Sequence, residues 1–322
     1  MMRSSSEKAI RSNPKAVVLF GPTAVGKTAM TENLFSKGFE IINADSIQVY
    51  RGLDIGSAKP DPELRKKIKH HLVDIRDPWE DYNSGEFCID AISLIHEINS
   101  RGSIPLITGG TAYYFRQLMY LPAKTPQSDP GIRKSVKEEI SAKGDEWAYS
   151  YLSQVDPASA KRINSHDMYR VSRAIEVYRQ TGMPLSSFSV SDKIRDDVDF
   201  AAVGLRRPKA ELDKRIAMRV DMMFDMGFYD EIKRLIREGA QPSWPSMEAI
   251  GYREFFEARE NPESSLRSIK ESIIRNSSRY AKRQMTFFQS FSDAVFFHPE
   301  DEEGIRRYIE SKLGIQLCVS TS

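Results

Sequence analysis

Short apolar runs that end in turn residues recur through the first third of the chain. AVVLF at 16–20 leads into a glycine-rich loop, and IPLITGG at 104–110 ends in paired glycines. EIINA at 40–44 and HHLVDI at 70–75 are two further runs that lead into aspartates. Helix-like stretches such as FCIDAISLIHEINSRG lie between the runs. Buried strands that alternate with helices predict an α/β fold, a parallel sheet with helices on both faces.

The pattern changes after about residue 122. LPAKTPQSDPG is a proline-rich linker, and residues 130–185 then read as successive helices with no strand pattern between them. Strand-like runs return in DFAAVGL at 199–205 and AVFFHP at 294–299. Strands on both sides of a helical block predict an all-helical insertion into one α/β core. We expect a flexible tail at 1–13, a core formed by 14–122 plus 198–322, and a helical insertion at 123–197.

Composition and charge narrow the class of protein. The 322 residues include 47 Lys and Arg against 45 Asp and Glu, a net charge of +2. No apolar run approaches the roughly 18–20 residues that a membrane-spanning helix needs, so a membrane is not an expected partner. The opening MMRSSSEKAIRSNPKA lacks the apolar stretch of a secretory signal. The sequence therefore predicts a soluble, cytoplasmic globular protein, with a monomer as the default.

The segment GPTAVGKT at 21–28 predicts a phosphate-binding loop. It follows a predicted strand and opens a predicted helix, the context in which this motif binds phosphate. Glycines let the backbone N–H groups point toward anionic oxygens, and the helix N-terminus adds partial positive charge. Lys27 supplies a full charge, and the Thr28 hydroxyl can ligate Mg²⁺. The loop alone does not distinguish ATP from a diphosphate ester.

A second polar segment, INADSIQVYRGLDIGSAKP, spans 42–60. Asp45 at the end of a predicted strand could be a magnesium ligand or a base. The amide of Gln48 can make a two-point contact with the edge of an adenine. That contact could serve ATP or a base of a nucleic acid equally well.

Several long motifs occur together in one order and spacing. These are GPTAVGKT, INADSIQVYRGLDIGSAKP, HHLVDIRDP, GGTAYYF, RVSRAIEVYRQTG, IGYREF and RYAKRQMTFF. In this the chain closely resembles the bacterial-type tRNA dimethylallyltransferases, from about Pro14 to Phe288. The resemblance implies a P-loop NTPase-like core. It also implies transfer of a dimethylallyl group from its diphosphate to the exocyclic amine of the adenosine immediately 3′ of the anticodon. The expected partners are dimethylallyl diphosphate, Mg²⁺ and the anticodon stem-loop of tRNAs that read codons beginning with U.

The resemblance also implies roles for individual residues. Asp45 is expected to take a proton from the adenine amine, a poor nucleophile that needs this help. Thr23 and the more distant Arg219 are expected to stabilise the departing diphosphate. Arg215, one helical turn before Arg219, should point to the same side. The residues expected to hold the diphosphate are Gly21, Thr23, Ala24, Val25, Gly26, Lys27 and Thr28, with Thr28 as the magnesium ligand.

Two basic clusters are candidates for gripping RNA. Arg275, Arg279, Lys282 and Arg283 fall on one helical face, while Arg170 and Arg173 share another. The apolar residues between the arginines of the second cluster are expected to face the core. Together with the resemblance, these clusters give the expected tRNA contacts: Asp45, Ser46, Ile47, Gln48, Thr111, Tyr169, Arg170, Val171, Ser172, Arg173, Arg279, Lys282 and Arg283.

Three alternative functions stay open on the sequence. A nucleotide or small-molecule kinase would bind ATP on the loop and use an aspartate such as Asp74 as a metal partner. An adenylate isopentenyltransferase would share the loop and the base but act on free nucleotides. A catalytically silent RNA-binding module would have no use for Lys27 and Asp45 together. The chain also departs from the usual family pattern in Ala112-Tyr113-Tyr114, Ser57 and Phe287.

Overall fold

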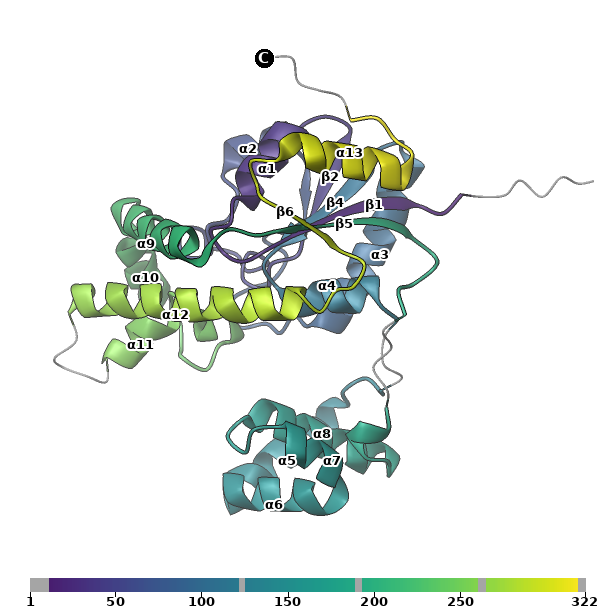
Figure 1. The fold of residues 1–322 in the computed structure, drawn as a ribbon. Helices are drawn as coiled ribbons and strands as arrows, with labels where there is room; N and C mark the ends of the chain where they lie inside the picture. Colours follow the sequence, from purple (N-terminus) through teal and green to yellow (C-terminus); the bar gives the residue numbers. More distant parts are fainter. Residues whose placement is uncertain (1–11, 122–124, 189–192, 260–264, 318–322) are drawn as a thin grey trace, which may run out of the picture. The chain divides into compact units, whose positions relative to one another are not determined.

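Six strands form one sheet in the computed structural model, in the order β3-β2-β4-β1-β5-β6, and all neighbouring strands run parallel (Figure 1). The structure describes residues 12–121, 125–188, 193–259 and 265–317. The expected tail at 1–13 therefore lies almost wholly outside the described residues. The strands are β1 (Lys15–Phe20), β2 (Phe39–Asn43), β3 (His70–His71), β4 (Ile104–Gly109), β5 (Asp199–Leu205) and β6 (Val295–Phe297).

The edge strand β3 is shorter than the apolar run at 70–75 predicts. Leu72 and Asp74 have φ angles of 61° and 58°, in the left-handed region that ends extended structure. Only His70 and His71 pair with β2. The apolar residues beyond them enter a turn, so the prediction of a six-residue strand is wrong in its extent.

Helices cover both faces of the sheet, as the sequence predicts. α1 (Lys27–Leu34) and α13 (Glu302–Leu313) pack on one face, and α3 (Ser84–Ser100), α4 (Ala112–Met119) and α12 (Leu266–Phe288) pack on the other (Figure 1). The remaining helices of this unit are α2 (Pro62–Lys67), α9 (Lys209–Asp225), α10 (Phe228–Arg237) and α11 (Arg253–Arg259), with a short 3₁₀ turn, η2 (Pro245–Glu248). None of the helices in the described ranges is long and apolar enough to cross a bilayer.

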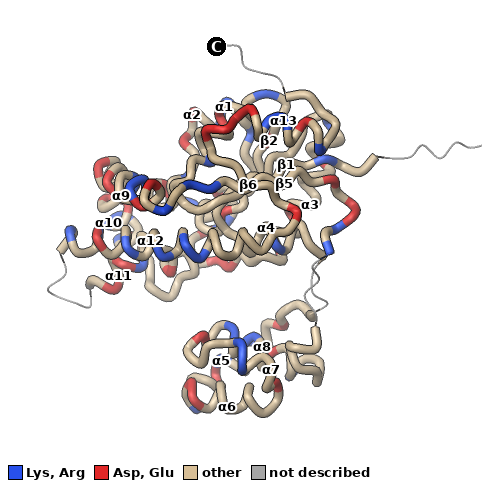
Figure 2. Tube along the Cα trace, in the orientation of Figure 1, with Lys and Arg blue, Asp and Glu red and all other residues tan. Residues whose placement is uncertain are grey.

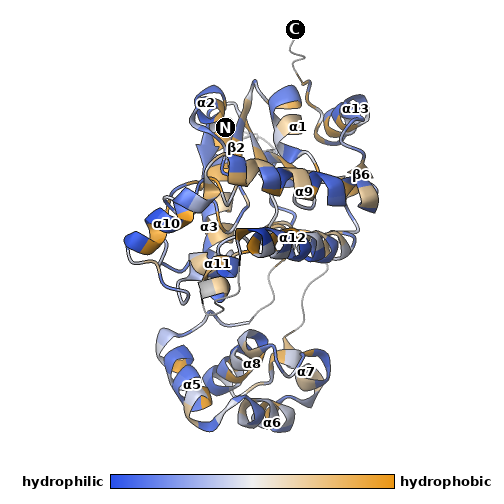
Figure 3. Cartoon of the chain, turned by 90° about the vertical axis from the view of Figure 1, so that its left-hand side faces the viewer, coloured by the Kyte–Doolittle hydropathy of each residue, from blue (hydrophilic) through white to orange (hydrophobic). Residues whose placement is uncertain are grey.

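The core between the sheet and its second helical layer is aromatic. Phe20, at the end of β1, is fully buried and stacks on Phe288 of α12 with ring centroids 4.7 Å apart. Phe115 and Phe291 surround the same ring at 5.5 and 5.3 Å. Figure 3 shows hydrophilic residues on the outward surfaces of α9, α12 and α13. Truncating Phe20 to alanine would cost about 3–5 kcal/mol, so this cluster fixes the strand that carries the phosphate loop.

The chain divides into two compact units. One comprises Met1–Met119 and Asp196–Ser322, and the other comprises Tyr120–Arg195. The second unit is built from α5 (Pro130–Lys143), α6 (Asp145–Val155), α7 (Pro157–Arg162), α8 (Met168–Thr181) and a short 3₁₀ turn, η1 (Leu185–Ser187). These helices enclose a core of their own that includes Val136, Leu152, Val171 and Ile175. The sequence places the boundaries of the insertion at 123 and 197, two to three residues later than this division.

The register of the sheet brings three loops to one edge. Phe20 of β1 lies opposite Gly109 of β4, and Asn43 of β2 lies opposite Thr108 of β4. The three strands therefore end side by side, and the loops that follow them begin together. Ligands of parallel sheets bind at this edge. The residues after these strands are the place to look for a site.

Candidate active site

The phosphate loop between β1 and α1 is held in a left-handed curl. Ala24 has a φ of 61° and Gly26 a φ of 118°, and α1 begins at Lys27. A side chain at Gly21 would lie 2.8 Å from the carbonyl oxygen of Leu205, so only glycine fits where the loop leaves β1. Alternating backbone conformations of this kind turn successive N–H groups toward one point and create an anion-binding concavity.

The Lys27 side chain lies inside this loop. Its Nζ donates to the carbonyl oxygens of Gly21 and Pro22 at 2.8 and 3.0 Å. The pKa of Lys27 is lowered from 10.5 to about 7, mainly by burial and also by the guanidinium of Arg219, while Asp45 opposes the shift. A bound anion would stabilise the charged form of Lys27 and so raise its pKa again.

Asp45 follows β2 and is fixed by its own turn. Its Oδ1 accepts the N–H of Ile47 at 2.9 Å. Gly110 borders the second oxygen, because a Cβ added there would lie 3.7 Å from Oδ2 and only 2.9 Å from Nε2 of Gln284. Thr111 holds Ser46, the residue after Asp45, because its Oγ1 accepts the N–H of Ser46 at 2.9 Å. The carboxylate is therefore preorganised through Oδ1, while Oδ2 accepts no hydrogen bond from the residues that the structure describes.

Arg219 projects from α9 toward the same space. It is half-buried, and burial lowers the pKa of its guanidinium while Asp45 opposes the shift. Within the described part of the chain, no carboxylate lies within ion-pair distance of Arg219. A half-buried cation without a paired carboxylate is a typical recognition group for an anionic ligand. Arg215, one turn earlier, donates from Nε to the carbonyl oxygen of Ala24 at 2.8 Å.

These groups line one cavity of about 570 Å³. The expected site residues in its lining are Thr23, Ala24, Val25, Gly26, Lys27, Thr28, Asp45, Gln48 and Arg219. Apolar side chains complete the lining, among them Val220, Met222, Met223, Ile250 and Ile273. The cavity thus joins a cationic end, a carboxylate and an apolar wall. Such a lining suits a ligand with an anionic head and a short hydrocarbon.

Gln284 is a site residue that the sequence reasoning missed. It lies on α12, is only 3% exposed, and its Oε1 accepts the N–H of Thr23 at 3.0 Å. Its Nε2 donates to the carbonyl oxygen of Gly110 at 2.6 Å. One side chain therefore ties the phosphate loop to the loop after β4. The sequence does carry a clue, since Gln284 falls on the buried stripe of α12 with Ala281 and Phe288.

The amide of Gln48, expected to contact an adenine edge, is hydrogen-bonded within its own loop in this structure. Its Nε2 donates to the carbonyl oxygens of Ser57 and Ala58 at 3.2 and 3.0 Å, so both amide N–H groups are taken. A two-point contact with adenine would have to break these bonds. In this structure Gln48 therefore positions its own loop, and its contact with adenine stays a prediction.

A buried carboxylate that the sequence reasoning also missed shapes the loop opposite Gln48. Oε2 of Glu231 accepts the N–H groups of Asp54 and Ile55 at 2.9 and 2.7 Å. Oε1 accepts the N–H of Gly56 at 3.1 Å and the hydroxyl of Tyr252 at 2.7 Å. Four hydrogen bonds to one carboxylate fix this loop firmly, and with it the carbonyls that hold Gln48.

The expected RNA contacts on α12 lie on its outer surface. Arg279, Lys282 and Arg283 are exposed, and Figure 2 shows lysines and arginines along this helix. Within the described ranges, no carboxylate lies within ion-pair distance of these three side chains. Three exposed cations on one face form a surface that suits a phosphate backbone. They are not part of the cavity.

The expected RNA contacts on α8 differ in their accessibility. Tyr169 is 75% exposed, and its carbonyl oxygen accepts the hydroxyl of Ser172. Arg170 is exposed and pairs with Asp167, but Arg173 is half-buried and held by Glu176. Val171 is fully buried in the core of the second unit, which confirms the prediction that the apolar residues of this segment face the core, and its side chain is not exposed to contact tRNA.

The metal partner that a kinase would need is already engaged. Asp74 accepts from Lys59 through Oδ1 at 2.6 Å and from Arg65 through Oδ2 at 2.7 Å. It does not line the cavity. Both carboxylate oxygens thus serve a structural ion-pair network, and the feature that most favoured a kinase has a different role.

The family models, the curated relatives and the solved structures that this chain matches are all isopentenyl or dimethylallyl transferases. A family model described as IPP transferase matches residues 48–291, and one described as Isopentenyl transferase matches residues 14–77. A tRNA dimethylallyltransferase of Borrelia turicatae is 43% identical over 89% of this chain and 95% of its own length. A tRNA dimethylallyltransferase 2 of Geotalea uraniireducens is 41% identical over 85% of this chain and 89% of its own length.

Solved structures agree with these relatives. The tRNA isopentenylpyrophosphate transferase of Bacillus halodurans aligns with a TM-score of 0.64 at 32% identity, covering 93% of this chain and 98% of its own. A eukaryotic dimethylallyltransferase captured acting on tRNA aligns with a TM-score of 0.74 at 27% identity, covering 93% of this chain and 76% of its own. The resemblance that the motifs predict is confirmed: the chain belongs to the IPP transferase family, whose curated relatives here are tRNA dimethylallyltransferases.

Proposed function

We propose that this protein transfers a dimethylallyl group from dimethylallyl diphosphate to the exocyclic amine of the adenosine 3′-adjacent to the anticodon, in tRNAs that read codons beginning with U. The observation that carries the proposal is the joint presence of the Asp45 carboxylate and the phosphate loop in one cavity with an apolar wall. Family membership supports the same chemistry. The apolar wall distinguishes this cavity from one that would hold only the phosphates of ATP, because it suits the hydrocarbon of a prenyl diphosphate.

Asp45 is the proposed base. The amine nitrogen forms a bond to C1 of the dimethylallyl group as the bond from C1 to the bridging oxygen breaks. The amine then carries an excess proton, which passes to the open Oδ2 of Asp45. Because Ile47 holds Oδ1, the carboxylate keeps its orientation while the bond forms. General-base help of this kind contributes about 10²–10⁴-fold to a rate.

The diphosphate leaves with its charge stabilised by the loop. The proposed donors are the loop amides, the hydroxyl of Thr23, and the cations of Lys27 and Arg219, which all line the cavity. Gln284 keeps Thr23 in place through its backbone N–H. Groups fixed before the reaction stabilise developing charge without any cost of rearrangement during it.

A magnesium ion fits this site. The Thr28 hydroxyl lines the cavity beside Lys27, and hydroxyl and diphosphate oxygens are the hard ligands that Mg²⁺ prefers. We propose that Thr28 and the diphosphate would hold the ion. When bound, it would offset the charge of the diphosphate.

The two basic surfaces are proposed to hold the tRNA. Arg279, Lys282 and Arg283 of α12 and Arg170 of α8 are exposed cations, and Tyr169 is an exposed aromatic beside the latter. The target adenosine must leave the stack of the anticodon loop to reach Asp45, at a cost of a few kcal/mol. Contacts between these cations and the phosphate backbone of the tRNA can supply that energy. We further propose that the protein acts as a cytoplasmic monomer.

The direct test is incorporation of label. Purified protein with Mg²⁺ and radiolabelled dimethylallyl diphosphate is given unmodified tRNA in one reaction and AMP in another, with Asp45→Asn alongside. We expect label in tRNA only, and a loss of about 10²–10⁴-fold in rate for the variant. Label in AMP alone would overturn the tRNA proposal. Consumption of ATP with no label transferred would establish a kinase instead.

A second test addresses the basic face of α12. Replacing Arg279, Lys282 and Arg283 together with glutamine should raise KM for tRNA and leave KM for dimethylallyl diphosphate unchanged. Each lost phosphate contact lowers the dependence of log K on log salt by about 0.7–0.9, so the slope should fall by roughly 2–3. The matched control removes three charges from α13, at Arg306, Arg307 and Lys312. Equal effects of both triple variants would refute a specific contact surface on α12.

A further inference from the structure

Arg207 lies behind the phosphate loop, outside the cavity. Its side chain is only 7% exposed, and its Nε donates to the carbonyl oxygen of Val25 at 2.9 Å. It follows β5, which pairs with β1, the strand that carries the loop. The arginine therefore reaches the loop from the neighbouring strand, 182 residues away along the chain.

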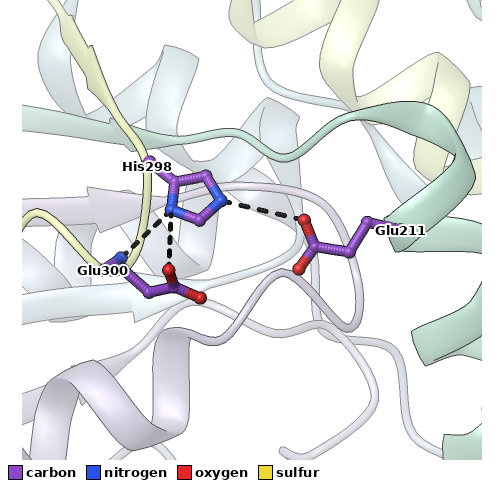
Figure 4. Close-up of side chains that lie close together, drawn as sticks. All are labelled: Glu211, His298 and Glu300. Carbon is purple, nitrogen blue, oxygen red and sulfur yellow. Dashed lines mark hydrogen bonds and ion pairs between the residues drawn. The ribbon is translucent and has the colours of Figure 1, made fainter.

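Three side chains surround the other end of this arginine. Figure 4 shows Glu211, His298 and Glu300 close together, with the ring of His298 between the two carboxylates. Their ligand-type atoms lie within 4.8 Å of one another, an arrangement that could hold a metal ion. The NH1 group of Arg207, however, is hydrogen-bonded to Glu211 and lies 3.4 Å from both His298 Nε2 and Glu300 Oε1. A guanidinium thus already occupies the place of a cation, and the cluster serves to orient Arg207.

The carbonyl that Arg207 holds belongs to the peptide between Val25 and Gly26. In a trans peptide the C=O and N–H groups point in opposite directions. With the Val25 oxygen fixed toward Arg207, the N–H of Gly26 is directed to the cavity side, where Gly26 is part of the lining. Gly26 has a φ of 118° and no side chain to restrain it, so this peptide can rotate more easily than its neighbours.

We propose that Arg207, oriented by Glu211, His298 and Glu300, is a positioning residue that holds the Gly26 N–H toward the diphosphate. The inference rests on the proposed function, in which the loop binds the diphosphate of the prenyl donor. Arg207 does not touch the substrate, and Glu211 and Glu300 offset its charge. Its contribution is therefore the direction of one backbone dipole rather than an added positive charge. Without it, the Val25–Gly26 peptide samples both orientations, and only one of them donates to the anion.

The test compares Arg207→Met with Arg206→Met. Arg206 is exposed and adjacent, so its replacement removes the same charge without removing the hydrogen bond to the loop. For Arg207→Met we expect diphosphate to bind about tenfold more weakly in calorimetry, because a hydrogen-bond donor is lost from the loop. kcat/KM for dimethylallyl diphosphate should fall by at least as much, while KM for tRNA stays unchanged. Arg207→Lys, which retains a donor, should recover part of the loss.

A direct readout of the peptide completes the test. With ¹⁵N-labelled glycine, the Gly26 amide signal of the wild type should shift on addition of diphosphate, and in Arg207→Met the shift should be reduced at equal saturation. Wild-type protein that fails to bind diphosphate would overturn the proposed function itself. Wild-type binding combined with unaltered diphosphate affinity in Arg207→Met would overturn only the role of Arg207. A parallel rise in KM for tRNA would likewise overturn it, because the defect would then extend beyond the diphosphate site.

Discussion

Gln284 accepts the backbone N–H of Thr23 at 3.0 Å, across 261 residues of sequence. A helix near one end of the chain thereby fixes the phosphate loop near the other. The same side chain donates to the carbonyl of Gly110, so two of the three loops at the edge of the sheet share one partner. The geometry of the site thus depends on where α12 packs against the strand ends.

Replacing Gln284 with leucine should impair both loops. The variant leaves the Thr23 N–H and the Gly110 carbonyl without their partner, a cost of about 1–3 kcal/mol for each buried group. We expect a lower Tm and a reduced kcat/KM for dimethylallyl diphosphate, measured by thermal unfolding and steady-state kinetics. Gln289→Leu, at an exposed position just beyond the same helix, is the control. Wild-type kinetics in Gln284→Leu would show that the loops keep their positions without this bridge.

The pKa of Lys27 predicts how binding depends on pH. Because burial and Arg219 lower this pKa to about 7, the free protein loses the Lys27 proton as pH rises through neutrality. Diphosphate prefers the charged amine, so at pH 8 binding should be accompanied by proton uptake and should weaken as pH rises. Calorimetry in buffers of different ionisation enthalpy measures this uptake.

The control for this prediction is Lys27→Arg. Arginine stays charged throughout the range, so uptake by this side chain disappears while protonation of the diphosphate itself remains. The difference between the two proteins isolates Lys27. Equal proton uptake by the wild type and the arginine variant would contradict the prediction.

Gly56 should not tolerate even alanine. An added Cβ would lie 2.3 Å from Phe228 and 2.5 Å from Tyr252, two rings in the core behind the loop. Overpacking of this kind costs about 1–3 kcal/mol or displaces the backbone. Displacement would move the carbonyls that hold Gln48. We therefore expect Gly56→Ala to lower both Tm and kcat/KM.

Gly131→Ala provides the comparison for Gly56. There the nearest atom to an added Cβ is Oδ1 of Asp129 at 3.2 Å, a much smaller overlap than with the two rings at Gly56. This variant should retain its Tm and its kinetics. If both alanine variants behave alike, the close approach of the rings to Gly56 is not what excludes a side chain.

Glu40 should make the free energy of unfolding depend on pH in the acid range. It is buried, and hydrogen bonds from Arg101 and His71 lower its pKa from 4.5 to about 2, against the opposing effect of burial. A depressed folded-state pKa gives stability that is present above about 4.5 and lost as pH falls toward 2, roughly 3 kcal/mol here. Glu40→Gln should lower the free energy of unfolding at pH 7 and flatten its fall in acid, as urea unfolding at several pH values would show. A Glu40→Gln protein as acid-sensitive as the wild type would refute this role.

The sequence predicted the parts of the fold and site that depend on local patterns. The sheet, the helices on both faces and the curled loop before Lys27 all follow from short apolar runs and glycine spacing. The sheet register then explains why Asp45 and Lys27 share a cavity, since strand ends that lie side by side bring their following residues together. The length of β3 was misjudged because the positive φ angles of Leu72 and Asp74 leave no apolar or polar pattern.

Contacts between distant segments could not be predicted in the same way. Nothing in the sequence around Arg207 predicts its hydrogen bond to the carbonyl oxygen of Val25, which lies 182 residues away along the chain. Val171 shows the difference between two kinds of prediction: the apolar pattern of α8 places it in the core, where it lies, whereas a motif assigned by resemblance includes residues from all sides of a helix. A helix presents only one side to a partner. The buried side of α8 builds the core of its own unit.

The chain leaves for the helical unit and returns from it at neighbouring points. Tyr120 pairs antiparallel with Ile194, and the N–H of Leu121 donates to the carbonyl of Lys193 at 3.0 Å. A two-residue Asn-Gly turn could therefore join Leu121 to Lys193 and close an ordinary β-hairpin. All residues that line the cavity belong to the α/β core, and none belongs to the helical unit. A chain shortened by this turn would keep every residue that lines the cavity and would lose α8 with its exposed Arg170.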